Sequence, residues 1–328
     1  MTTTSTTIGR ARPGAARTTS TRHLLAALGA VTALLCALAA AVPAPADAAR
    51  RGHCIGQSGP RCHFWKGKVT FVADGDTIDV DIRGDRRGPR RVRLTGINAP
   101  ELRRYSHTRS RRRGQCHGVS ATNRLEDLIR AGHWRVRLAA QRPSSHSGHR
   151  LRRQVSVRLN GAWVDTGLVQ VGEGRALWLP GHPESAWNDL YRRAAIAASN
   201  ARAGMYGVPA CRPPAPSAQL ELGLRWDAPH ADADHVRGEW IRVRNRSLFP
   251  VRLGGWWVRD AALRRFRFPR GTVVPPGGQV TVRVGRGHRH GHTFFWGLRR
   301  PAFENKGDGG YLFDRHANLR AWHIYPNP

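Results

Sequence analysis

The stretch VADGDTIDV, residues 72–80, gathers carboxylates in a chain that is otherwise rich in arginine. Four aspartates lie within it or directly after it: Asp74, Asp76, Asp79 and Asp81. Residues 68–82 alternate apolar and polar types and are rich in Val, Ile and Thr, which predicts a β-strand. Two roles are open for the carboxylates. They are either turn and edge residues on the solvated face of a sheet, or groups that hold a cation against a polyanionic substrate.

More strands and helices follow this stretch. Residues 90–97, 134–140 and 151–159 read as strands, and the last of them turns at Asn160-Gly161. Residues 119–131 place Ala121, Leu125, Leu128 and Ile129 on one helical face, and two further helical stretches lie near residues 165–172 and 184–203. Short strands that enclose a helix, followed by more helix, predict a mainly β (α+β) domain: a five-stranded barrel of the OB type.

The sequence pattern changes from mixed strands and helices to short strands after a proline-rich segment at residues 209–217. Beyond it, residues 240–244, 256–259, 279–284 and 310–313 read as short strands separated by Gly and Pro, as in a β-sandwich. We therefore expect a first domain at residues 67–212, a linker at 213–219 and a sandwich at 220–328. Residues 49–66 form an N-terminal segment ahead of the first domain.

The N-terminus has the pattern of an export signal. Arginines precede an apolar run at residues 24–42, and Ala46-Asp47-Ala48 supplies a small-residue cleavage site. We expect residues 1–48 to be a cleaved signal peptide and the protein to be secreted. The alternative is a membrane anchor formed by an uncleaved signal.

Cysteine usage fits an oxidising compartment. Four cysteines remain after the signal: Cys54, Cys62, Cys116 and Cys211. An even number in an exported protein predicts disulfides. We expect a small Cys54–Cys62 clip and a Cys116–Cys211 bond, although the two outer cysteines are open to the other pairing.

Charge points to the class of partner. The chain has 54 Lys and Arg residues against 22 Asp and Glu residues, a formal net charge of +32. A field this positive attracts nucleic acid, anionic lipid or acidic polysaccharide. Nucleic acid is the expected partner, and a cell-envelope polyanion is a further candidate. The oligomeric state stays open.

The motifs DGDT, residues 74–77, and RLTGINAPE, residues 93–101, together with a later arginine-containing hairpin, resemble the staphylococcal nuclease (thermonuclease) family. The resemblance covers residues 67–212. It implies an OB-fold and metal-dependent hydrolysis of phosphodiester bonds in DNA, with RNA a second candidate substrate. Cleavage would have low sequence selectivity and leave 3′-phosphates.

The resemblance also implies roles for single residues. Asp76, Asn98 and the carbonyl of Ala99 fall where the family binds Ca²⁺. Arg93 and Arg150 fall where it clamps the phosphate, with Arg152 the alternative to Arg150. Glu101 falls on the carboxylate that activates water. Guanidinium groups suit phosphate because they fork onto its oxygens and stay charged.

Asn98 departs from the family pattern, in which a second aspartate usually occupies that position. An amide oxygen still ligates a cation but brings no charge, so Ca²⁺ should bind more weakly. The competing hypothesis is therefore a catalytically weak or inactive nucleic-acid-binding protein on the same scaffold. A weaker idea is an envelope structural protein whose second domain carries the function.

Residues 220–325 resemble the lamin-tail domain, on the motifs GEWIRVRN at 238–245 and LGGWWVRD at 253–260. The resemblance implies an immunoglobulin-like β-sandwich. Four arginines at positions 264, 265, 267 and 270 interleave with Phe266 and Phe268. That pattern suits either a grip on nucleic acid or an ordinary sheet with one solvated face.

Overall fold

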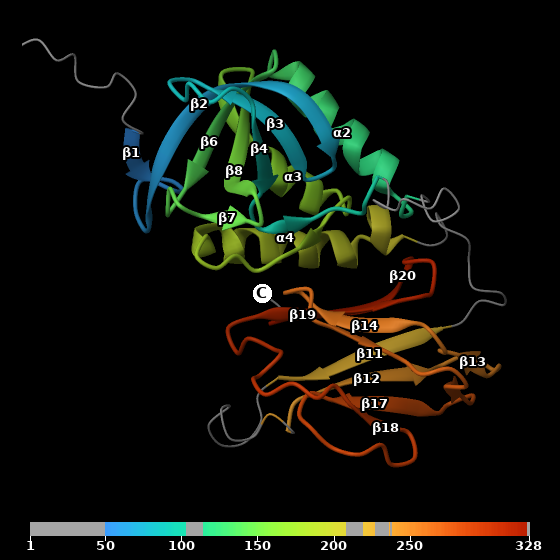
Figure 1. Ribbon diagram of the computed structural model, residues 1–328. Coiled ribbons are helices and arrows are strands. Elements are labelled where there is room, and N and C mark those ends of the chain that lie inside the picture. Colours follow the sequence, from blue (N-terminus) through green and yellow to red (C-terminus); the bar gives the residue numbers. More distant parts are fainter. Residues whose placement is uncertain (1–49, 103–113, 208–218, 227–235, 237, 327–328) are drawn as a thin grey trace, which may run out of the picture. The chain divides into compact units, whose positions relative to one another are not determined.

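The computed structural model describes residues 50–102, 114–207, 219–226, 236 and 238–326 (Figure 1). The predicted signal peptide, the predicted linker up to residue 218 and Cys211 lie outside these ranges. Both β-rich regions, residues 50–207 and residues 219–326, are described below one at a time. As the sequence predicts, strands dominate the described residues.

The first region is built on an eight-stranded sheet. Its strands are β1 (Arg50–His53), β2 (Arg61–Asp74), β3 (Thr77–Ile82), β4 (Arg90–Leu94), β6 (Arg135–Ala140), β7 (His146–Ser147), β8 (Arg150–Leu159) and β9 (Ala162–Asp165). The order is β1-β2-β3-β4-β8-β6, and β6 also pairs with β2. The hydrogen-bonded order β2-β3-β4-β8-β6 thus returns to its first strand. The OB-type barrel is compatible with this order and stays a prediction.

Residues 72–80 are a hairpin and not the single strand that their pattern predicts. Strand β2 ends at Asp74 and β3 begins at Thr77, so Gly75 and Asp76 form the turn. A Cβ on Gly75 would lie 2.6 Å from the Cβ of Ala121 and 2.8 Å from that of Ala99. Only glycine fits where the turn packs so closely on its neighbours.

Among the described residues of this region are three α-helices, of which two contact strands of the sheet and the third packs on the second. They are α2 (Gly118–Ala131), α3 (Thr166–Gly172) and α4 (Asn188–Asn200). The apolar face predicted for α2 is buried, including Ala121, Leu125 and Ile129. The single helix predicted at residues 184–203 instead begins with a short 3-10 turn, η2 (Ser185–Trp187), before α4. A two-stranded sheet of β5 (Ile97–Asn98) and β10 (Leu177–Trp178) completes the region.

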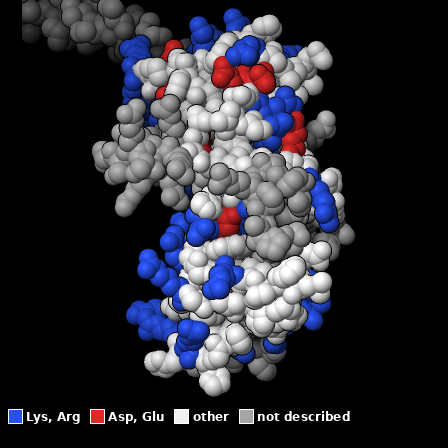
Figure 2. Space-filling model, turned by 90° about the vertical axis from the view of Figure 1, so that its right-hand side faces the viewer, with Lys and Arg blue, Asp and Glu red and all other residues white. Residues whose placement is uncertain are grey.

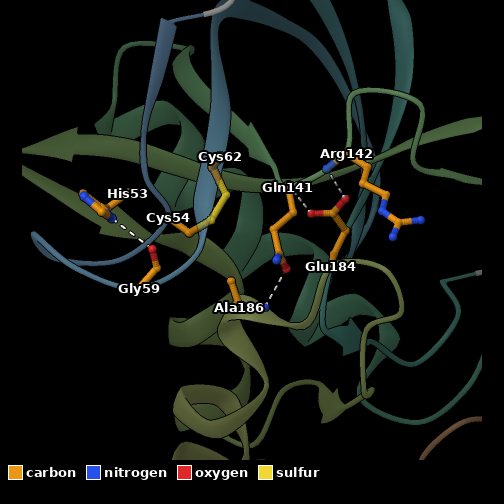
Figure 3. The surroundings of a disulfide bond; sticks show 8 residues. All are labelled: His53, Cys54, Gly59, Cys62, Gln141, Arg142, Glu184 and Ala186. Carbon is orange, nitrogen blue, oxygen red and sulfur yellow. Dashed lines mark hydrogen bonds between the residues drawn. A yellow bond between two sulfur atoms is a disulfide. The ribbon is translucent and has the colours of Figure 1, made fainter.

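The predicted Cys54–Cys62 disulfide is confirmed (Figure 3). It ties the loop after β1 to β2, and the Cys62 side chain is fully buried. Strand β2 runs without interruption through residues 66 and 67, so residues 61–66 share the sheet of the region predicted to start at Gly67. The predicted Cys116–Cys211 bond lies outside the described residues because Cys211 does.

Nearby, a buried carboxylate holds two segments together. Glu184 accepts hydrogen bonds from the backbone N–H groups of Gln141 at 2.6 Å and Arg142 at 3.1 Å, and the Gln141 side chain accepts one from Ala186 (Figure 3). These bonds fix the turn between β6 and β7. The same turn leads into β7, which forms a hairpin with β8, and Arg150 is the first residue of β8.

The second region is an immunoglobulin-like β-sandwich, as predicted. One sheet has the order β11 (Leu220–Arg225), β12 (Trp240–Asn245), β17 (Gln279–Arg283), β18 (Thr293–Phe295). The other has the order β15 (Arg265–Arg267), β14 (Trp257–Asp260), β19 (Asp308–Phe313), β20 (Leu319–Tyr325). A short pair, β13 (Val251–Arg252) and β16 (Val273–Val274), lies at one end. Apolar side chains of both sheets, such as Ile241, Val282 and Leu312, form its core.

Within the described ranges, no helix is both long enough and apolar enough to span a bilayer.

Candidate functional site

Asp76 is the centre of the candidate site. It lies in the turn between β2 and β3, and its side chain is only 1% exposed. One carboxylate oxygen, Oδ1, accepts hydrogen bonds from the Thr77 hydroxyl at 2.9 Å and from the Arg93 guanidinium. The other, Oδ2, accepts one from the backbone N–H of Ala99 at 2.7 Å. Protein donors therefore engage both oxygens of Asp76.

Arg93 reaches this carboxylate because of strand register. It stands on β4 directly opposite Thr77 on β3, so its side chain emerges beside the turn. A second guanidinium nitrogen donates to the carbonyl oxygen of Ile97 at 3.2 Å. The guanidinium is thus held between an acidic side chain and a backbone carbonyl, with a mostly buried side chain.

Arg150 joins the site through Thr77. Its Nη1 atom lies 3.5 Å from the Thr77 hydroxyl oxygen, and its side chain also approaches Ser147 in the same hairpin. Arg152, the alternative, pairs in register with Arg93 across β4 and β8. Its guanidinium instead donates to the carbonyl of His182 at 2.7 Å. Of the two arginines, Arg150 is the one bonded to the Asp76 turn.

Glu101 lies within electrostatic reach of the same groups. Its backbone is clamped by Gln115: the Glu101 N–H donates to the Gln115 side-chain oxygen, and the Gln115 N–H donates to the Glu101 carbonyl, both at 2.8 Å. Burial raises the pKa of the Glu101 carboxyl, the Asp74 carboxylate raises it further, and Arg93 and Arg150 lower it. The Glu101 carboxyl is thus within electrostatic range of both arginines.

The same balance acts on Asp76. Burial raises the pKa of its carboxyl to about 7, while the Arg93 guanidinium lowers it and the Asp74 carboxylate raises it. Asp74 is near because its own Oδ1 accepts a hydrogen bond from the Asp76 backbone N–H at 3.0 Å. Burial prevails because the carboxylate loses more free energy on leaving water than Arg93, Thr77 and Ala99 restore.

The predicted cation ligands do not complete a calcium site in this arrangement. Ca²⁺ takes six to eight oxygen ligands and favours several carboxylates. Here the oxygens of Asp76 are engaged by Arg93, Thr77 and Ala99, and Asn98 brings no charge. Among the residues that the structure describes, no group of three or more His, Cys, Asp or Glu side chains is placed to hold a metal ion.

The last two aspartates of the opening stretch, Asp79 and Asp81, lie on the solvated side of the sheet. Both oxygens of Asp79 accept from Arg91 at 2.7 Å, on the exposed side of the sheet, and Asp81 is exposed. For Asp79 and Asp81, the interpretation as residues on the solvated face of a sheet is therefore right. Asp74 and Asp76 are the pair that enters the site.

Gln170 is a residue of the site that sequence reasoning missed. Its side chain on α3 is fully buried, and its amide nitrogen donates to the carbonyls of Gly75 at 2.7 Å and Ala121 at 2.8 Å. It fastens the turn that carries Asp76 to helix α2. The one signal in the sequence is a polar residue within an apolar helical stretch.

Positive charge extends well beyond the site. On the face drawn in Figure 2, blue Lys and Arg side chains are widely spread, whereas red Asp and Glu side chains gather in few places. This agrees with the excess of 54 basic over 22 acidic residues in the sequence.

Comparison with known proteins bears on the second region. No curated protein matches the chain. The comparisons give no support for the nuclease resemblance of residues 67–212, which stays a prediction. Residues 226–327, close to the range 220–325 expected from the sequence, match the family model of the Lamin Tail Domain.

Proposed function

We propose that the protein is a secreted nuclease that hydrolyses phosphodiester bonds of DNA, with RNA a second candidate substrate. The single observation that carries this proposal is the convergence of Asp76, Arg93 and Arg150 through Thr77, with Glu101 in electrostatic reach of both arginines. The resemblance of residues 67–212 to the staphylococcal nuclease family, on an OB-type barrel, supplies the expected order of these residues.

The chemistry assigns the residues their parts. Arg93 and Arg150 would bind non-bridging oxygens of one phosphate and stabilise the negative charge that builds on them. Glu101 would orient a water molecule and accept its proton as the water attacks phosphorus. Asp76 would hold the Arg93 guanidinium in place. The family resemblance implies a 3′-phosphate and a free 5′-hydroxyl as products.

Calcium dependence is a separate part of the proposal. The resemblance implies Ca²⁺ at Asp76, Asn98 and Ala99, but Asp76 is already bonded to Arg93. We therefore assign no step to the cation. The digest described next measures whether the protein needs it.

The test is digestion of supercoiled plasmid by the purified protein, with and without a chelator. Glu101→Gln should lower turnover by roughly 100-fold or more, with little change in DNA affinity, because it removes the base and leaves both arginines. The matched control is Glu126→Gln, a carboxylate on helix α2 paired with Arg130, which should cut like the wild type. Equal cutting by all three proteins would remove Glu101 from the mechanism.

A nucleic-acid-binding protein without catalysis is the second candidate function. Asn98 favours it, because an uncharged amide stands where the family usually supplies a carboxylate. Absence of cutting by the wild type at high protein concentration, with or without Ca²⁺, would favour this binder. Cutting that Glu101→Gln abolishes would rule it out.

A further inference from the structure

The outer face of the sheet β11-β12-β17-β18 is the strongest unassigned surface in the second region. Along these strands, buried core residues such as Leu224, Ile241 and Val282 alternate with side chains on the opposite face. Six of the outward residues are arginine or aromatic. We call them the basic face: Arg225, Trp240, Arg242, Arg244, Arg283 and Phe295.

Strand register places these residues side by side. Arg225 on β11 stands opposite Trp240 on β12, and Trp240 stands opposite Arg283 on β17. Arg283 in turn stands opposite Phe295 on β18. Directly opposed side chains on one face of a sheet have Cβ atoms about 4.5–5.5 Å apart. The four residues therefore form one continuous row that alternates charge and ring.

Charge on this face is almost all of one sign. Arg225, Arg244 and Arg283 are exposed, and Arg242 is half-buried. Glu221 is the carboxylate among the outward positions of β11, and it accepts a hydrogen bond from Arg246 at 2.6 Å. Glu221 also stands opposite Arg244 in the register of β11 and β12, so one acid adjoins the basic face, and an arginine outside the face binds it.

The side chain of Trp240 extends over the neighbouring strand β11. Its Cζ3 atom would contact a Cβ added to Gly223 at 3.7 Å, so the ring extends toward a position with no side chain. The Arg242 guanidinium lies over the ring, 4.1 Å from its centre, and donates to the Thr281 hydroxyl at 3.4 Å. Trp240 is half-buried and so keeps part of its surface in solvent.

We propose that the basic face binds single-stranded nucleic acid. Guanidinium groups pair with backbone phosphates, and an exposed aromatic ring or a stacked arginine plane supports a base. A flat sheet does not enter the groove of a duplex as a helix does, but it does present stacking positions to splayed bases. The proposal deepens the proposed function. It rests on that function in one respect: it names the same polymer, nucleic acid, as the substrate that the first region would cut.

The test measures binding apart from cutting. The purified full protein, carrying Glu101→Gln to prevent digestion, is titrated into a fluorescently labelled oligo-dT of about 20 nucleotides. The test variant is the triple substitution Arg225→Gln, Arg244→Gln and Arg283→Gln. The matched control removes three exposed arginines of the same region that lie outside the face: Arg252→Gln, Arg270→Gln and Arg299→Gln.

The triple variant should bind at least about 10-fold more weakly, and its slope of log affinity against log salt should fall by about 2, because roughly 0.7 is lost per phosphate contact on single strands. The control should retain most of the affinity. Equal losses in the two triple variants would overturn the proposal, since net charge alone would then explain binding.

Stacking is tested by Trp240→Leu against two ligands. Affinity for oligo-dT should fall about 10-fold, and affinity for dextran sulfate, which has charge but no bases, should stay unchanged. Equal losses for both ligands, or none for either, would overturn the assignment to nucleic acid. Recovery of the oligonucleotide at full length after each titration shows that these measurements report binding, whether or not Glu101 takes part in cutting.

Discussion

Arg93 and Asp76 form a buried ion pair, in which the guanidinium donates to the carboxylate that the sequence motif assigns to a cation. The pair has the Asp76 turn on one side and the Ile97 carbonyl on the other. Asp76 is therefore in a position to orient Arg93, the arginine that we propose binds the phosphate. Its burial also couples the site to pH.

The variant Asp76→Asn should change how stability depends on pH. Burial raises the pKa of the Asp76 carboxyl from 3.8 to about 7, so between these values the folded state binds more protons than the unfolded state. Stability that this group confers is therefore present at low pH and falls as pH rises toward 7, by up to about 4 kcal/mol.

Urea unfolding of wild type and Asp76→Asn at about pH 5 and about pH 8 checks this. The wild type should lose stability relative to the variant between the two conditions, because asparagine does not titrate. A difference in unfolding free energy that stays constant with pH would show that Asp76 titrates near its ordinary value.

Arg150 and Arg152 should differ in their effect on cleavage. Arg150 is bonded to Thr77 at the Asp76 turn, whereas Arg152 bonds the carbonyl of His182. Lysine keeps the charge but not the fork of donors, so Arg150→Lys should lower kcat/KM by about 100-fold and Arg152→Lys by less than about 10-fold. The reverse order in a plasmid digest would make Arg152 the phosphate ligand.

Gln170→Ala should damage both the fold and the site. The change leaves the carbonyls of Gly75 and Ala121 without their donor and opens a cavity, at a cost of about 2–4 kcal/mol in unfolding free energy. The control is Gln57→Ala, at an exposed position, which should leave the Tm unchanged. If Gln170→Ala melted with the wild type, its two hydrogen bonds would not hold the turn.

Much of this fold follows from patterns within short windows. The helix at Gly118–Ala131 was predictable because its apolar residues repeat at helical spacing, and the Cys54–Cys62 bond was predictable because the two cysteines lie only eight residues apart. The strands of the sandwich follow from alternation bounded by Gly and Pro. Such local signals do not depend on the rest of the chain.

The turn at Gly75-Asp76 could not be read in the same way. Asp74-Gly75 is a common turn pair, but the apolar residues Val72, Ile78 and Val80 keep the same parity on both sides of it, so the hairpin looks like one long strand. What fixes it is packing against Ala121 and Ala99 and a hydrogen bond from Gln170, which is 95 residues away. Contacts at that separation leave no local pattern. Likewise, the motif named Asp76 as a ligand, and only the fold reveals that Arg93 engages it.

The Cys54–Cys62 disulfide should add modest stability. Its loop is short, so closing it restricts the unfolded chain by an amount worth about 2–3 kcal/mol. The double variant Cys54→Ala and Cys62→Ala should unfold at lower urea concentration by this amount. A reducing agent should shift the wild type the same way. No shift in either experiment would show that pairing between β1 and β2 alone holds the segment.

Asn98→Asp should strengthen calcium binding if the implied cation site forms. The change adds a carboxylate at the position where the family usually has one, beside the backbone N–H of Ala99 that already donates to Asp76. One added charge on a Ca²⁺ ligand should raise affinity by about 10-fold, measured by calorimetry with the metal alone. Asn188→Asp serves as the control, because this asparagine bonds Gly181 at the start of helix α4 and is not one of the residues brought to the Asp76 turn. If Asn98→Asp binds Ca²⁺ no better than the wild type, Asn98 is not a ligand, and the Asp76–Arg93 pair occupies the place that the family gives to the metal.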